Sequence, residues 1–367
     1  MNKLSSIAYY VTDKISSNDI SLSEYVTTDC ILQNKKGREV ASNLPPQPCC
    51  LTRYQRGDIL IANIRPYLKK VWFADIDGGA SSDVLVFRAK EGHSPSFLYA
   101  VLLQDSFFDY VMQGAKGSKM PRGDKEQILR YEMPTLSCSE ESIGTFFLNL
   151  DQKIRLNEQI NQNLEAMTKQ LYDYWFVQFD FPNEEGKPYK SSGGAMVWNE
   201  TLKRDIPEGW NDCVLGDYIG RITNGLNPRK NFVLGNGNNY YVTIRSLAGT
   251  TIDWNNCDRC DDEALAKINS RSQLQIGDII FSAIGTIGRT YYILEEPSNW
   301  NISETSFTLR AKNNVPNDFF YGMLRSNEIQ IKSDKAAMGS TLRCLVMDSL
   351  CSLLYVKVPE KIMCTFS

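Results

Sequence analysis

The 367-residue chain is poor in the residues and loops with which enzymes usually carry out chemistry. It has one histidine, and it lacks both the Gly-x-x-x-x-Gly-Lys phosphate loop and the glycine fingerprint of dinucleotide-binding proteins. The histidine, His93, lies in a loop-like Glu-Gly-His-Ser-Pro stretch, and the sequence shows neither a nucleophile nor a metal ligand to pair with it. We therefore predict that His93 is solvated, and that the chain has no catalytic residues and no bound cofactor or metal.

Cysteine pairs and long apolar runs are also scarce. Ten cysteines in a chain of this length do not form a disulfide framework. Cys257-x-x-Cys260 has metal-ligand spacing, but a structural zinc site needs a second pair, which is missing. No apolar run reaches the length of a membrane span, and the first residues lack an apolar signal core. We expect a reduced compartment, the cytoplasm.

Charge and composition limit the classes of protein further. The net charge of −3 argues against a protein that coats nucleic acid indiscriminately. A local basic face remains compatible with it, because binding follows the local potential rather than the net charge. A hydrophobic content of 42% supports well-packed cores, and the length favours two globular domains.

The most informative feature that is present is an internal repeat. Gly57-Asp58-Ile59 returns as Gly277-Asp278-Ile279, 220 positions later. Three further landmarks return in the same order: 81–90 as 304–312, Gly117-Ser118 as Gly339-Ser340, and Met133-Pro134 as Val358-Pro359. A period of this size excludes a solenoid and indicates a duplicated domain. We predict an α+β protein with two similar, mixed and strand-rich domains, 1–136 and 210–359, and such a molecule suits a ligand with two half-sites.

Several local patterns predict elements within these domains. Short β-branched and aromatic runs indicate strands at 58–62 and 70–74, and residues 83–88 read as a strand buried on both faces. Apolar residues at helical spacing predict a helix over 97–110. Gly285-Thr-Ile-Gly288 resembles a glycine-rich ligand loop, but it follows a strand and opens no helix, so we interpret it as a hairpin turn.

Residues 137–178 predict one long helix. Ser137-x-x-Glu140 forms a capping box, and after Gly144 no glycine or proline follows before Pro182. Apolar residues recur in a seven-residue frame and form a seam for a partner helix: Ile143, Phe147, Leu150, Ile154, Leu164, Leu171 and Trp175. The alternative is a long helix that lies on its own domain.

The remaining segments are expected to be connections. Glycine, proline and serine cluster in residues 179–209, which predicts a linker. After Pro359 the repeat predicts a second long helix, but only residues 360–367 follow, so we interpret them as the stub of a helix that is missing.

This arrangement of domain, long helix and domain resembles the specificity subunit of type I restriction–modification enzymes. Residues 57–74 and 81–90 are similar to the start of a target recognition domain in that family, and 114–124 with 128–136 are similar to its end. Residues 156–194 and 197–210 look like the family's central spacer helix and the segment that leaves it. The helix end Leu171-Tyr-Asp-Tyr-Trp-Phe176 is the most specific of these similarities.

The resemblance implies a function without catalysis. Each target recognition domain would read one half of a split double-stranded DNA site. Two long helices would form an antiparallel coiled coil that fixes the gap between the half-sites, and the central helix would be one arm of it. Methyltransferase subunits would dock on the helices, and restriction subunits with motor and nuclease activity would join for cleavage. S-adenosylmethionine, ATP and Mg²⁺ would belong to these partner subunits.

Clusters of basic residues beside glycine provide candidate DNA contacts, because cations that neutralise phosphates release counterions. The alternative for each residue is a solvated surface charge. The candidates are Arg65, Lys69, Lys116, Ser118, Lys119, Arg122, Lys125, Arg229, Lys230, Lys335, Ser340 and Arg343.

Two functions from different classes remain open. The first is a DNA-reading specificity subunit. The second is a truncated or phase-varied specificity chain that binds partner subunits or is inactive. An enzyme that acts alone on nucleic acid is disfavoured by the scarcity of catalytic groups.

Overall fold

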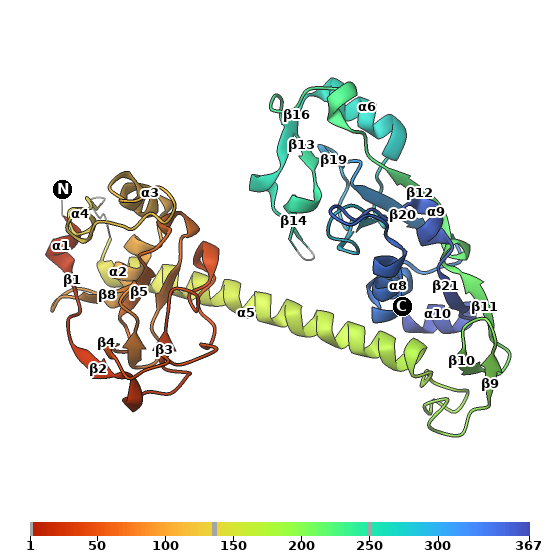
Figure 1. Cartoon of the computed structure of the whole chain (residues 1–367), viewed down its shortest axis with the longest axis horizontal. Helices are drawn as coiled ribbons and strands as arrows, with labels where there is room; N and C mark the ends of the chain where they lie inside the picture. The colour runs from red at the N-terminus through yellow and green to blue at the C-terminus, as the bar shows by residue number, and fades with distance from the viewer. Residues whose placement is uncertain (1–2, 134–137, 249–250) are drawn as a thin grey trace. The chain divides into compact units, whose positions relative to one another are not determined.

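The computed structural model describes residues 3–133, 138–248 and 251–367, without the side chains of Lys230 and Ala248. The chain divides into two compact units, Met1–Asn161 and Gln162–Ser367. Both combine small, mainly antiparallel sheets with short helices, and one long helix, α5 (Glu140–Tyr172), contributes to both (Figure 1). The expected α+β class is confirmed.

The first unit contains two four-stranded sheets. The central sheet has the order β1-β8-β5-β6, and all of its neighbouring strands are antiparallel. The second sheet has the order β2-β4-β7-β3. The elements of this unit are α1 (Leu4–Ile7), β1 (Ala8–Tyr10), β2 (Lys14–Ser16), η1 (Ser17–Asp19), β3 (Tyr25–Val26), η2 (Gln33–Lys35), β4 (Cys50–Tyr54), β5 (Ile59–Ala62), η3 (Pro66–Leu68), β6 (Val71–Phe73), β7 (Gly78–Ala80), β8 (Val84–Ala89), α2 (Pro95–Leu102), α3 (Asp105–Gln113) and α4 (Lys125–Ile128).

Both faces of the central sheet are buried, because alternate residues of a strand point to opposite faces. In β5, Ile59 and Ile61 join the core formed with α2 and α3, whereas Leu60 joins the core formed with the second sheet. The first four residues of β8, Val84 to Phe87, are all buried. The strand at 83–88, predicted to be buried on both faces, is therefore confirmed.

The second unit repeats the central sheet of the first. Its order is β12-β20-β17-β18, again antiparallel throughout, beside a three-stranded sheet β16-β13-β19. The strands are β9 (Met196–Asn199), β10 (Arg204–Pro207), β11 (Asn211–Val214), β12 (Ile219–Asn224), β13 (Asn239–Val242), β14 (Leu247–Ala248), β15 (Thr251–Ile252), β16 (Asp258–Cys260), β17 (Ile279–Ser282), β18 (Thr290–Tyr292), β19 (Trp300–Ile302), β20 (Ser306–Ala311) and β21 (Leu354–Lys357). The helices are η4 (Asp173–Val177), η5 (Leu215–Asp217), η6 (Pro228–Lys230), η7 (Ile244–Ser246), η8 (Trp254–Asn256), α6 (Asp262–Ser272), α7 (Asn317–Arg325), α8 (Asn327–Ala336), α9 (Met347–Cys351) and α10 (Glu360–Phe366).

The sequence repeat corresponds to a repeat of structure at the entry to the sheets. Gly57 and Gly277 both have left-handed backbone, with φ of 91° and 90°. The aspartate after each glycine is buried and paired with an arginine of the neighbouring strand: Asp58 with Arg88, and Asp278 with Arg310. The hairpin turn predicted at Gly285–Gly288 is confirmed, since it joins the antiparallel strands β17 and β18.

The helix expected over 97–110 is two helices. α2 ends at Leu102, Gln104 has extended backbone, and α3 begins at Asp105. All six residues from Phe97 to Leu102 are buried, and so are Phe107, Phe108 and Val111. A break allows both segments to turn their apolar residues into the core, which one straight helix would not.

The long helix is confirmed, but its predicted N-terminal cap is not. Ser137 lies outside the described residues. Glu140 accepts hydrogen bonds from His93 Nδ1 at 2.9 Å and from the Ser94 backbone N–H at 3.2 Å. Ser139 Oγ accepts from the Ser142 N–H instead. His93 therefore has a partner, contrary to the expectation of a solvated side chain.

Residues 179–209 form packed structure, and the expectation of a linker was wrong. Phe179 and Phe181 are buried in the core of the second unit. Asp180 accepts hydrogen bonds from the Ser191 N–H at 2.7 Å and the Ser191 hydroxyl at 2.6 Å, and β9 and β10 form an antiparallel hairpin. Gly186 and Gly193 have positive φ at turns of this segment, whereas Pro182 and Pro188 pair with each other in a β-bridge. Residues 360–366, expected to be a stub, form the helix α10, whose Phe366 packs against Tyr172 and Trp175 of the long helical segment.

Candidate nucleic-acid interface

Three basic loops meet at one edge of the first unit. The η2 loop contacts the η3 loop through a hydrogen bond from the Lys35 N–H to the Lys69 carbonyl, 2.9 Å long. The η3 loop contacts the loop after α3 through a bond from the Arg65 N–H to the Pro121 carbonyl, 2.8 Å long. The structure thus brings cationic residues from three distant parts of the sequence onto one surface.

The backbone of these loops has an unusual conformation. Seven non-glycine residues of the described chain have positive φ, and four of them lie here: Asn34, Lys35, Arg65 and Lys69. Left-handed backbone is unfavourable for residues with a Cβ, and such residues gather at sites where the surroundings require one shape. The loops are therefore held in one conformation by their contacts.

Asp105 joins two of the loops by ion pairs. Its Oδ1 lies 2.7 Å from Lys35 Nζ and 2.8 Å from Lys69 Nζ. Hydrogen bonds from these two ammonium groups lower the pKa of Asp105 to about 2. The carboxylate is still 61% exposed, so solvent screens the attraction and its main effect is to hold the lysines in place.

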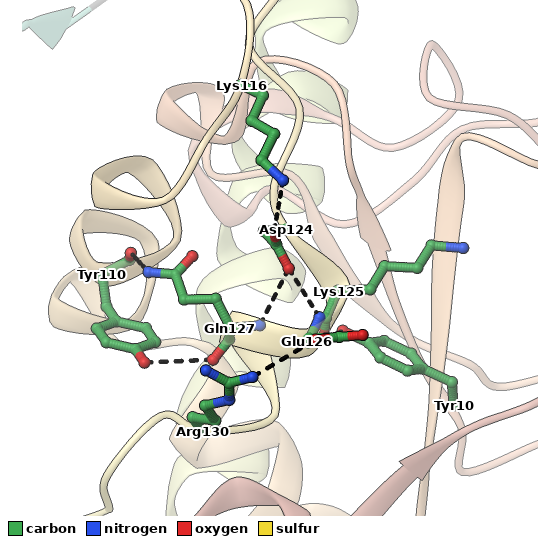
Figure 2. Close-up of polar contacts among 8 residues, drawn as sticks. All are labelled: Tyr10, Tyr110, Lys116, Asp124, Lys125, Glu126, Gln127 and Arg130. Carbon is green, nitrogen blue, oxygen red and sulfur yellow. Dashed lines mark hydrogen bonds and ion pairs between the residues drawn. The ribbon is translucent and has the colours of Figure 1, made fainter.

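The loop after α3 closes as a tight hairpin above α4. Lys116 and Arg122 exchange two backbone hydrogen bonds of 2.9 Å. Figure 2 shows the contacts at its base: Asp124 caps α4 by accepting from the Glu126 and Gln127 N–H groups, and it also pairs with Lys116 Nζ at 3.0 Å. The Lys116 ammonium and these backbone bonds lower the pKa of Asp124.

The predicted DNA-contacting residues of the first unit fall into two groups. Lys69, Lys116 and Arg122 are paired with the carboxylates of Asp105, Asp124 and Asp83. In contrast, no residue that the structure describes forms an ion pair with the exposed side chains of Arg65, Lys119 and Lys125. Figure 2 shows Lys125 extending away from the contacts at the base of the loop. Ser118 is exposed beside Lys119. The second group can bind phosphate without first losing an acidic partner.

The second unit has the same hairpin at the equivalent place. Met338 and Cys344 exchange backbone hydrogen bonds of 2.9 and 2.8 Å, and the Gly285 N–H donates to the Arg343 carbonyl at 2.8 Å. This register aligns Met338 with Lys116 and Cys344 with Arg122. Basic residues therefore do not recur at these two positions, whereas the Gly-Ser pair does.

The remaining candidates of the second unit lie on more than one element. Lys335 ends α8, exposed Ser340 lies in the hairpin, and Arg343 pairs with Asp334. Arg229 is exposed on η6, whereas the side chain of Lys230 lies outside the described residues. Arg289 stands where Lys70 stands in the first unit, since the Ser282 N–H donates to its carbonyl as the Ala62 N–H donates to that of Lys70. Its guanidinium donates to the carbonyls of Ile244 and Leu247, at 3.2 and 3.1 Å.

Sequence reasoning missed Lys35, Asp105 and Arg289. The run Asn34-Lys35-Lys36-Gly37 carried a usable signal, since two cations before a turn glycine resemble the clusters that were selected. Asp105 gave no such signal, because its role depends on two loops that meet it only in the fold.

The seam predicted on α5 is largely exposed. Phe147, Leu150, Ile154, Leu164 and Leu171 are exposed, whereas Ile143 and Trp175 pack against the cores of the first and second units. Four further exposed apolar residues lie on α5 beside the predicted seam: Phe146, Leu156, Ile160 and Met167. Each directly precedes a position of the seven-residue frame, so they widen the exposed apolar stripe.

Metal-binding clusters and membrane-spanning helices are absent from the described part of the chain. No group of three or more histidine, cysteine, aspartate or glutamate residues there could hold a metal ion. None of the helices described is both long and apolar enough to cross a membrane.

Comparisons with known proteins point to one family. The chain is 24% identical over 239 residues to the specificity subunit of the type I restriction enzyme MjaIX of Methanocaldococcus jannaschii, covering 64% of this chain and 50% of that protein. It is 29% identical over 167 residues to the HindI specificity subunit of Haemophilus influenzae, covering 42% of this chain and 36% of that protein. The chain therefore spans half or less of the length of these relatives.

Comparison with solved structures points in the same direction. The crystal structure of the type I restriction–modification S subunit from M. genitalium matches with a TM-score of 0.55 at 14% identity, covering the whole of this chain and 88% of that one. No protein-family model matches the chain. In sequence and in fold, the chain is similar to specificity subunits of type I restriction enzymes.

Proposed function

We propose that this chain is a DNA-recognition subunit of a type I restriction–modification enzyme, and that each of its two units reads one half of a split duplex site. The observation that carries the proposal is the hairpin that recurs in both units, beyond the end of the equivalent central strand (β5 or β17) and beside exposed basic residues. Two equivalent surfaces in one chain suit a target with two half-sites.

The electrostatics support DNA as the ligand. The chain is slightly acidic overall, but Arg65, Lys119 and Lys125 are exposed around the first hairpin without a counter-ion in the described structure. Their contacts with phosphate would be strengthened by counterion release. Acidic partners at Lys69, Lys116 and Arg122 limit binding to arbitrary DNA, since these pairs must open before the cations can reach phosphate.

The proposed role is not catalytic. The relatives are named as specificity subunits, and the candidate surface consists of cations and small residues rather than an acid, a base and a nucleophile. S-adenosylmethionine, ATP and Mg²⁺ would be bound by methyltransferase and restriction subunits in the cytoplasm. The exposed apolar stripe of α5 is the surface that we assign to partner subunits.

The same stripe favours the second candidate function, a chain that binds partner subunits without reading DNA. The two functions make different predictions for the isolated chain. A DNA reader binds duplex DNA by itself, with an affinity that falls steeply as salt is added. A chain that only binds partners shows no such affinity.

The test is a binding titration of the full chain on duplex DNA at several salt concentrations. The variant is Arg65→Ala/Lys119→Ala/Lys125→Ala, and the control is Lys187→Ala/Lys203→Ala/Lys361→Ala, which removes the same charge from exposed sites elsewhere. We expect the first variant to bind more weakly and to lower the salt slope by up to about 0.9 for each lost phosphate contact. Equal behaviour of the two variants would place the DNA surface elsewhere.

A further inference from the structure

A large apolar side chain is exposed at the tip of the hairpin in both units. Met120 is 51% exposed and Leu342 is 64% exposed. Single exposed apolar residues are common on protein surfaces and need no explanation. These two differ because they occupy the same structural position in two copies of one fold.

The closure of the two hairpins establishes this equivalence. Lys116 bonds to Arg122 across the first hairpin, and Met338 bonds to Cys344 across the second. Each pair encloses five residues, and the tip residue is the fourth of them in both cases. Met120 and Leu342 are therefore matched by hydrogen-bond register rather than by sequence similarity.

The hairpins hold the tip residues firmly. Gly117 and Gly339 have φ of 98° and 104°. A Cβ at these positions would lie 3.3 Å from the Met120 carbonyl oxygen and 2.5 Å from that of Leu342, so only glycine allows the chain to turn this tightly. The residue after each tip is also bonded to the neighbouring loop, by Arg65 N–H in the first unit and by Gly285 N–H in the second.

The residues around the tips differ between the two hairpins. Lys119 in the first stands where Thr341 stands in the second, and Pro121 stands where Arg343 does. An apolar tip is thus kept while its charged neighbours change. Removing either side chain from water on a partner would be favourable, since each tip is at least half exposed in the described structure.

We infer that Met120 and Leu342 contact the bases of the DNA, one in each half-site, and that they determine specificity rather than affinity for the phosphates. The inference rests on the proposed function. An apolar side chain can recognise a base through the thymine methyl group in the major groove, or by insertion between base steps. The cations nearby would hold the duplex against the hairpin.

The experiment begins with selection of the preferred sequence of the wild-type chain from random duplexes. Met120→Ala and Leu342→Ala are then measured on the selected duplex and on a scrambled one. We expect each variant to bind the selected duplex about 5- to 100-fold more weakly. Binding to the scrambled duplex and the salt slope should stay unchanged, because no phosphate contact is lost.

Two kinds of control accompany these variants. Met120→Leu keeps an apolar side chain at the tip and should restore most of the discrimination. Val233→Ala and Leu294→Ala remove exposed apolar side chains at other surfaces and should leave binding unchanged. Repeating the selection should show relaxed preference in one half-site for Met120→Ala and in the other for Leu342→Ala.

Duplexes with uracil in place of single thymines identify the contacted group. An effect of Met120→Ala that disappears on one substituted duplex assigns the thymine methyl, and an effect that persists on all of them assigns insertion between bases. Two results overturn the inference: unchanged discrimination in both alanine variants, or equal weakening on selected and scrambled DNA. A wild-type chain that binds no duplex refutes the proposed function itself.

Discussion

At the scale of single residues, each of the two units contains an equivalent buried ion pair. Asp58 Oδ1 and Oδ2 each lie 2.7 Å from the Arg88 guanidinium, and Asp58 also accepts a hydrogen bond from the Gln55 N–H at 2.8 Å. Asp278 repeats the arrangement with Arg310 and the Gln275 N–H. Each carboxylate fastens the turn before a central strand to the next strand of the sheet.

Breaking one pair should therefore destabilise one unit. Asp58→Asn leaves the Arg88 guanidinium without its buried partner, and we expect a loss of about 3–5 kcal/mol in the free energy of unfolding of the first unit. Hydrogen exchange of the β5 and β8 amides measures this loss of stability, and the amides of β17 and β20 in the second unit are the internal reference. The control is Asp13→Asn, since Asp13 is 68% exposed and 3.9 Å from Arg88, and about 0.5 kcal/mol or less is expected. Equal effects of the two variants would show that the buried pair is unimportant.

A pH dependence follows from Asp105 at the loop junction. Its pKa is lowered in the folded chain, so its contribution is present above its ordinary value of about 3.9 and is lost as the pH falls toward about 2. We expect NMR titration of the Asp105 carboxyl group to show a low pKa that rises toward the ordinary value in Lys35→Met/Lys69→Met. The same pKa in the wild type and in this variant would contradict the ion pairs.

At the scale of elements, α5 is anchored near its two ends and exposed between them. In the first unit, Asp151 accepts a hydrogen bond from Tyr99 and pairs with Arg155. In the second, Glu165 pairs with Arg325 at 3.0 Å, and the Tyr172 hydroxyl lies 2.5 Å from that of Tyr355 in the core. Its stability therefore depends on tertiary contacts at the ends, as for most helices in proteins.

The two kinds of position on α5 should respond differently to substitution. Tyr172→Ala removes a fully buried ring, and we expect the free energy of unfolding of the second unit to fall by about 3–5 kcal/mol. Leu164→Gln should change stability by about 0.5 kcal/mol or less, since Leu164 is exposed. The Leu164→Gln substitution should also weaken self-association of the chain, because exposed apolar patches drive association. Denaturant titration and sedimentation measure the two effects, and unaltered self-association would mean that the stripe is not a contact surface.

At the scale of the whole molecule, the proposed function gives one chain two DNA-binding surfaces. Once one unit is bound, the second meets its half-site at a high effective concentration, which strengthens binding about 10²- to 10⁴-fold over a single half-site. Competition between duplexes with two half-sites and with one measures this gain. If both duplexes compete equally, only one unit reads DNA.

Much of this organisation follows from the sequence alone. The repeated Gly-Asp-Ile and Arg-Ala-Lys landmarks predicted two similar domains, because a buried ion pair and a left-handed glycine constrain residue types strongly. The long helix was predictable for a related reason: its heptad pattern is local, and no glycine or proline interrupts it after Gly144. Such patterns involve residues that are close together in the sequence, so they can be recognised without the tertiary structure.

Only the tertiary structure determined the features that join distant segments. The break at Gln104 lets both helices turn toward one core, and Phe179 and Phe181 are buried because a core lies beside them. Lys35, Lys69 and Asp105 meet at one point although they are far apart in the sequence. The match of Met120 with Leu342 depends on hydrogen bonds across each hairpin. Contacts of this kind arise from the path of the backbone through space, which periodicity and composition do not encode.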